Sequence, residues 1–95
     1  MADGSPADKG DEETRGLVDA AAKGDRAAWD RLVERFSGLV WSVTRSLGLS
    51  GDDATEVSEA TWLRLLEQID RIDPDRLGPW LADTARREAD DLRSR

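Results

Sequence analysis

The sequence predicts an all-α protein, a compact bundle of about four helices. Apolar residues recur at intervals of three and four through most of the chain, which is the spacing of one face of an α-helix. No stretch alternates apolar and polar residues with β-branched side chains, so a sheet is not expected. Short segments with glycine, proline and aspartate separate the periodic stretches, and short connections favour packing between successive helices.

The length of 95 residues is enough for one domain, which we expect over residues 15–95. Residues 1–14 are rich in glycine, serine, proline and aspartate, so we expect a disordered acidic leader there. No segment has the length and hydrophobicity of a membrane span or a secretory signal. The sequence therefore favours a soluble, cytoplasmic protein with no membrane partner.

The residue types argue against an enzyme. The chain has no cysteine and no histidine, which removes thiolate chemistry, the commonest general base and the commonest metal ligand. A catalytic pair of carboxyl groups would need a cleft that raises a pKa, and a bundle of this size offers little cleft. We therefore expect no catalytic residue, no metal and no cofactor.

The first two helices have clear ends. The first is expected from Arg15 to Lys23 and stops at Gly24, a residue type common just after a helix. Asp25 is a suitable N-cap for the second, which runs to a stop at Gly48. Its apolar stripe comprises Trp29, Leu32, Val33, Phe36, Val40, Val43 and Leu47.

The third helix is expected from about Gly51 to Asp70, with Ser50 as its N-cap. The predicted core face comprises Ala54, Trp62, Leu65, Leu66 and Ile69. The opposite face is acidic with apolar residues embedded in it, and residues 52–70 carry a net charge of −5. Such a face is either a docking surface for a protein or a solvated face with scattered small apolar residues.

Residues 70–79 are expected to form an irregular connector, because Pro74, Gly78 and Pro79 interrupt a helix there. The last helix follows, with Leu81, Ala85, Ala89 and Leu92 directed inward. Its arginines, Arg86 and Arg87, fit two interpretations. They contact phosphates of a nucleic acid, or they are neutralised by aspartates one turn away, at positions 83, 90 and 91.

Three sequence runs, in this order and spacing, resemble region 2 of the sigma-70 family, in particular its extracytoplasmic-function (ECF) group. They are GDRAAWDRLVERF, DDATEVSEATWLRL and WLADTARRE, and the resemblance covers about residues 16–93. It implies a bacterial transcription initiation factor that binds core RNA polymerase and recognises the melted −10 promoter element on the non-template strand. Similar proteins carry a second helical domain that reads the −35 element. Nothing here corresponds to it, so the chain is either an excised region 2 or a single-domain relative.

The resemblance also implies roles for individual residues. The acidic face of the third helix would dock on the clamp helices of the polymerase beta-prime subunit, through Asp53, Glu56, Val57, Glu59, Ala60 and Leu63. The connector and last helix would bind DNA, with one unstacked base in a pocket, through Arg71, Asp75, Arg76, Leu77, Trp80, Thr84, Arg86 and Arg87. Arg87 stands where an asparagine is common in the family. Asp90 and Asp91 stand where apolar or basic residues are usual, which favours an alternative: a sigma-like interaction module held by an anti-sigma factor or lacking DNA binding.

Overall fold

The computed structural model describes the chain from residue 6 to residue 95, and its side chains from residue 12. This range forms four α-helices and, between the last two, two short 3₁₀ turns, and it contains no strand. The elements are α1 (Pro6–Ala22), α2 (Arg26–Ser46), α3 (Gly51–Gln68), η1 (Ile69–Arg71), η2 (Pro74–Arg76) and α4 (Leu77–Arg93). The predicted all-α fold is confirmed.

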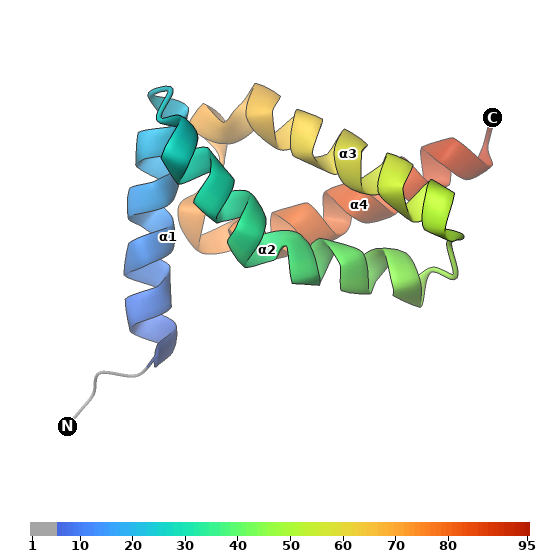
Figure 1. The fold of residues 1–95 in the computed structure, drawn as a ribbon, viewed down its shortest axis with the longest axis horizontal. Coiled ribbons are helices and arrows are strands. Elements are labelled where there is room, and N and C mark those ends of the chain that lie inside the picture. The colour runs from blue at the N-terminus through green and yellow to red at the C-terminus, as the bar shows by residue number, and fades with distance from the viewer. Residues whose placement is uncertain (1–5) are drawn as a thin grey trace.

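Helices α2, α3 and α4 run lengthwise beside one another, and α1 crosses one end of them (Figure 1). Helices α2 and α3 are antiparallel, and α4 packs against both. Helix α1 packs against α2 and against the turns η1 and η2. Among the described residues, no helix combines the length and the hydrophobicity needed to cross a bilayer.

The predicted stops at Gly24 and Gly48 and the predicted caps at Asp25 and Ser50 are confirmed. Gly24 and Gly48 have φ angles of 98° and 72°, which only glycine adopts without strain. The carboxylate of Asp25 accepts a hydrogen bond from the backbone N–H of Ala28 at 3.1 Å. The hydroxyl of Ser50 accepts one from the backbone N–H of Asp53 at 3.2 Å. Each cap satisfies a backbone donor that has no partner within its helix.

The buried apolar residues form two clusters. The larger contains Val18, Leu32, Val40, Leu65, Ile69, Leu77 and Leu81, and so joins all four helices. The smaller contains Val43, Val57, Ala85 and Ala89 and joins α2, α3 and α4. Burial of this apolar surface provides the main driving force for assembling the bundle.

The first helix differs from the prediction, since it begins at Pro6 rather than at Arg15. The guanidinium of Arg35 on α2 donates hydrogen bonds to Glu13 at 2.7 Å and to Thr14 at 3.2 Å. Thr14 is buried. These contacts hold Glu13 and Thr14 against α2, ahead of Arg15. Residues 6–14 are helical where a disordered leader was expected. Residues 1–5 lie outside the described range.

The buried face of α3 is rotated by about 60° from the predicted one. The buried residues of this helix are Ala54, Val57, Thr61 and Leu65. Thr61 belongs among them because its hydroxyl donates to the carbonyl of Val57 at 2.8 Å and so leaves no polar group unsatisfied. Leu66, predicted in the core, is 58% exposed. The prediction that Val57 contacts a partner is wrong, because Val57 lies in the core.

The connector is shorter than predicted. Helix α4 begins at Leu77, so Gly78 and Pro79 lie in its first turn. Proline is tolerated there because backbone N–H groups of a first turn have no acceptor within the helix. Leu77 is 1% exposed and belongs to the larger core cluster. The predicted contact between Leu77 and DNA is therefore wrong.

Candidate functional site

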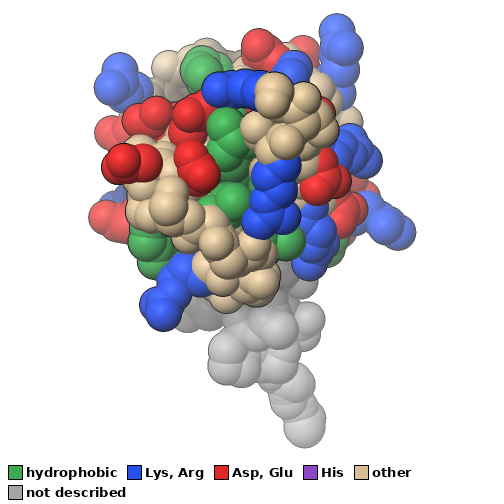
Figure 2. Space-filling model, turned by 90° about the vertical axis from the view of Figure 1, so that its right-hand side faces the viewer, with side chains coloured by type: hydrophobic (Ala, Val, Ile, Leu, Met, Phe, Trp, Pro, Cys, Tyr) green, Lys and Arg blue, Asp and Glu red, His purple; other side chains and the backbone are tan. Residues whose placement is uncertain are grey.

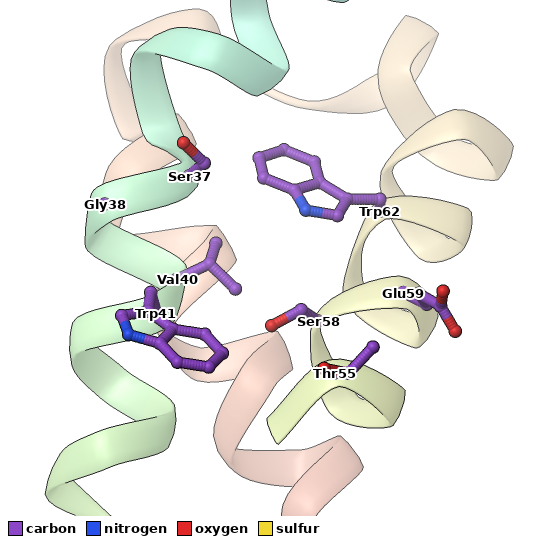
Figure 3. Close-up of a pocket in the computed structure, with 8 residues that line it drawn as sticks. All are labelled: Ser37, Gly38, Val40, Trp41, Thr55, Ser58, Glu59 and Trp62. Carbon is purple, nitrogen blue, oxygen red and sulfur yellow. The ribbon is translucent and has the colours of Figure 1, made fainter. Parts of the chain in front are cut away.

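An apolar groove of about 520 Å³ lies between α2 and α3. Its lining residues are Ser37, Gly38, Val40 and Trp41 of α2 and Thr55, Ser58, Glu59 and Trp62 of α3. Figure 3 shows the indole rings of Trp41 and Trp62 reaching into the space from opposite helices. The groove is thus built from two aromatic walls with one carboxylate at its edge.

Large exposed apolar side chains lie in the groove, at Trp41 of α2, and along the exposed side of α3, at Leu63 and Leu66. Trp41 is 44% exposed, Leu63 is 60% exposed and Leu66 is 58% exposed. Trp62 packs edge-on against Trp29, with ring centroids 6.4 Å apart and planes at 81°, which fixes its orientation. We call this surface the docking face: Trp41, Glu59, Trp62, Leu63 and Leu66. Clustered exposed apolar side chains are typical of protein-binding surfaces.

Sequence reasoning missed two parts of the docking face. Trp62 was assigned to the core, whereas the structure buries it only in part. Trp41 is not part of the apolar stripe predicted for the second helix. This position could have indicated an exposed surface residue. A large aromatic side chain outside the core stripe of a bundle helix must pack elsewhere or remain exposed.

A second, polar pocket of about 250 Å³ lies between the end of α3 and α4. It is lined by Arg64 and Gln68 of α3 and by Trp80, Thr84, Arg87, Glu88 and Asp91 of α4. Trp80, Thr84, Arg87 and Asp91 follow one another at intervals of four, three and four residues, and so share one face of α4. We call this site the polar pocket.

The charged groups of the polar pocket fall into two sets. Arg64 forms ion pairs with Glu88 at 3.2 Å and Glu67 at 3.7 Å. In contrast, no hydrogen bond or ion pair within the described part of the chain engages the side chain of Arg87 or of Asp91. One set therefore ties α3 to α4, and the other remains available to a ligand.

Figure 2 shows the end of the bundle where the α2–α3 turn lies near the end of α4. Acidic side chains gather on the left of this view, basic side chains lie mainly at its centre and right with acidic ones among them, and hydrophobic ones lie near the centre. This face therefore carries no continuous basic patch over the residues that are described. Binding of a nucleic acid here would have to rely on particular contacts rather than on a broad positive field.

Comparison with known proteins identifies the family. A model of sigma-70 region 2 matches residues 32–95. The RNA polymerase sigma factor NccH of Alcaligenes xylosoxydans xylosoxydans is 31% identical over 78 residues, which is 81% of this chain. The chain belongs to the sigma-70 family. It spans 42% of the length of that relative. No solved structure matches the chain.

The match places a sigma-70 region 2 domain over residues 32–95, and the sigma-70 family consists of transcription initiation factors rather than enzymes. Within this sigma domain, the residues predicted to bind polymerase are only partly together. Glu59 and Leu63 lie on the docking face, one turn apart. Glu56 is paired with Arg95 of the C-terminal segment. Asp53 and Ala60 are half-buried.

The residues predicted to bind DNA are also divided. The structure brings Trp80, Thr84 and Arg87 together in the polar pocket. Arg71 and Arg76 are exposed on the connector but do not line it. Of residues 71–80, which were predicted to form the pocket wall, only Trp80 lines the polar pocket, and the rest of its lining comes from α3 and from later residues of α4. Arg64, Gln68, Glu88 and Asp91 were missed, because the crossing of α3 over α4 that brings them together is not visible in the sequence.

The two arginines of α4 differ in their partners. Arg86 pairs with Asp83 at 3.2 Å, one turn before it. Arg87 pairs with neither Asp83 nor Asp91 within the described residues. Neutralisation within the helix, one of the two interpretations of these arginines, therefore holds for Arg86 and not for Arg87.

Asp75 was predicted to contact DNA, but a side chain of α1 engages it. The guanidinium of Arg15 donates two hydrogen bonds to the Asp75 carboxylate, at 2.8 Å and 2.9 Å. This bidentate contact connects α1 to η2 and holds the pKa of Asp75 below its usual value of 3.8. The contact fixes the turn η2 in place, while Asp75 and Arg76 remain exposed to solvent.

Asp75→Asn is expected to reduce stability at neutral pH, with a reduction that shrinks in acid. The lowered pKa means that the charged carboxylate stabilises the folded state above its unfolded pKa of about 3.8. This stabilisation is lost as the pH falls through the lowered pKa of Asp75. Urea denaturation of both proteins between pH 7 and pH 2 measures the difference. A difference that stays constant over this range would show that the Arg15 contact does not stabilise the fold.

Proposed function

We propose that this chain is the region 2 domain of an ECF-type sigma factor. In this proposal the docking face binds the clamp helices of the beta-prime subunit of core RNA polymerase, and the polar pocket captures one unstacked base of the melted −10 element. The observation that carries the proposal is the presence of two separate surfaces on one small bundle, one apolar and exposed, the other polar with an aromatic wall. The three sequence runs that resemble the ECF group support the subclass.

The docking face has the composition of a protein interface. Exposed aromatic and aliphatic side chains give apolar contact at its centre, and Glu59 offers a carboxylate at the rim to a basic residue of the partner. The hydroxyl of Ser58, which lines the groove, is buried without a hydrogen-bond partner among the described residues. A docked protein that supplies a partner for this hydroxyl would remove the cost of leaving it unsatisfied.

The polar pocket has what a flipped base requires. Trp80 offers an aromatic surface for stacking, and Thr84 and Arg87 offer hydrogen-bonding groups for the base edge. Arg71 and Arg76 are exposed on the neighbouring connector and suit contacts with phosphates. Because residues 71–95 carry no net charge, affinity would depend on the pocket more than on general attraction.

Arg87→Ala is expected to weaken binding of single-stranded −10-like oligonucleotides by about tenfold or more, since hydrogen bonds from a charged group are strong. The matched control is Arg86→Ala, which removes an arginine side chain at the preceding position. Arg86 is already paired with Asp83. The control should change affinity by no more than about twofold. Fluorescence anisotropy at low and moderate salt measures both. Equal losses in the two variants would contradict a role for the pocket.

The alternative function is that of a sigma-like interaction module, held by an anti-sigma factor or without DNA binding. Asp90 and Asp91 are exposed on α4 and would repel a nearby phosphate backbone, which favours this reading. The same titration separates the two functions. A chain that binds core polymerase but no oligonucleotide would support the interaction module.

A further inference from the structure

Two side chains of opposite charge face the same small space in the polar pocket. Arg87 and Asp91 lie one turn apart on α4, the spacing at which such residues commonly pair. No ion pair joins them, and neither is tied to another described side chain. The pocket therefore presents a fork of N–H donors and a pair of carboxylate acceptors, side by side and both without a partner among the described residues.

The other charged groups of the pocket are already committed. Arg64 is bound to Glu88, whose side chain is only 16% exposed. This pair lies at the side of the pocket, so Arg87 and Asp91 remain to recognise a ligand, with Trp80 as the aromatic wall. A ligand that satisfies both must present two adjacent acceptors and, on another edge, two adjacent donors.

Among the four DNA bases, guanine has this combination. Its O6 and N7 atoms are adjacent acceptors, which an arginine contacts with two parallel hydrogen bonds. Its N1–H and N2 amino groups are adjacent donors, which suit the two oxygens of a carboxylate. Adenine lacks two adjacent acceptors, thymine has one ring donor between two acceptors, and cytosine has a single amino donor.

We propose that the unstacked base held in this pocket is guanine, read by Arg87 at O6 and N7 and by Asp91 at N1 and N2. The inference rests on the proposed capture of a base and goes beyond it by naming the base and the atoms read. It gives Asp91 a role in recognition, although a carboxylate on this helix otherwise opposes DNA binding. Asp90, the adjacent residue, does not line the pocket and is the natural control.

The test measures binding of twelve-nucleotide thymine oligonucleotides by fluorescence anisotropy, each with one central guanine, adenine, cytosine or thymine. The guanine oligonucleotide should bind about tenfold more tightly than the other three. Inosine, which lacks the N2 amino group, and 7-deazaguanine, which lacks N7, should each lose part of this preference. Circular dichroism establishes that each protein variant is folded.

The variants then assign each atom to a side chain. In Asp91→Ala, guanine and inosine should bind alike, while 7-deazaguanine remains weaker. In Arg87→Ala, guanine and 7-deazaguanine should bind alike. Asp90→Ala should preserve every preference of the unmodified protein.

Two negative results differ in what they overturn. Equal binding of all four oligonucleotides, or tighter binding of another base, overturns the guanine assignment and leaves DNA binding by the domain intact. The assignment of atoms to side chains is also overturned if guanine is preferred but Asp91→Ala and Arg87→Ala bind guanine, inosine and 7-deazaguanine with the same preferences as the unmodified protein. No measurable binding of any oligonucleotide overturns both the guanine assignment and the proposed capture of a base.

Discussion

The double variant Trp41→Ala, Glu59→Lys is expected to abolish binding to the clamp helices of core RNA polymerase. Removal of a central aromatic side chain from an interface typically costs at least about 2 kcal/mol, and more when the residue is a hot spot. Reversal of the rim charge replaces an attraction by a repulsion. Together we expect affinity to fall by at least about a hundredfold, measured by co-purification or surface binding with core polymerase.

The fold should survive these two changes, because neither residue belongs to a buried core cluster and Trp41 is 44% exposed. Trp62 is a poorer choice for the test, since it packs against Trp29. Glu34→Lys is the matched control: it makes the same charge change on α2, at an exposed position that lines a different surface. Unchanged polymerase affinity in a folded double variant would show that the docking face is not the contact surface.

Local signals in the sequence predicted the ends of the first two helices and the start of the third. Gly24, Gly48 and Ser50 each act within a few residues of their own position, through a left-handed backbone or a cap. Such features depend on neighbours in the chain and not on the tertiary structure. For the same reason, the number and order of the helices after Gly24 followed from the sequence.

The orientation of α3 was predicted less well, and threonine is the reason. Thr61 is fully buried because its hydroxyl bonds to a carbonyl of the preceding turn, and Thr44 does the same with the carbonyl of Trp41 at 2.7 Å. A hydrophobic pattern counts both as polar. When Thr61 is counted with the apolar residues, the buried face moves toward Val57 and away from Leu66.

Contacts between residues far apart in the sequence account for the remaining differences. Arg35 holds Glu13 and Thr14, and Arg15 holds Asp75. The composition of residues 1–14 gave no indication of a partner on α2. Asp83 pairs with Arg86 and not with Arg87. The sequence allowed either pair, and side-chain geometry in the folded helix determines which one forms. These contacts hold α1 against α2 and η2, and the pair of Asp83 with Arg86 leaves Arg87 available to a ligand.

Leu81→Ala and Leu66→Ala are expected to differ sharply in stability, although hydrophobic periodicity placed both in the core. Leu81 is fully buried in the larger cluster, and removal of a buried leucine costs about 2–5 kcal/mol. This is a large fraction of the about 5–15 kcal/mol that stabilises a typical domain. Leu66 is 58% exposed, and its truncation should change stability by only about 0.5 kcal/mol. Urea denaturation followed by circular dichroism measures both.

The same pair of variants also tests the orientation of α3, on which the docking face depends. Leu66→Ala should remain folded and bind core polymerase more weakly, because Leu66 belongs to the docking face. Leu81→Ala should lose polymerase binding only in proportion to the fraction of the protein that unfolds. If Leu66→Ala instead destabilises the protein as much as Leu81→Ala does, then Leu66 is in the core. The buried face of α3 would then be the one predicted from periodicity, with Val57 at the edge of the exposed face and available to a partner.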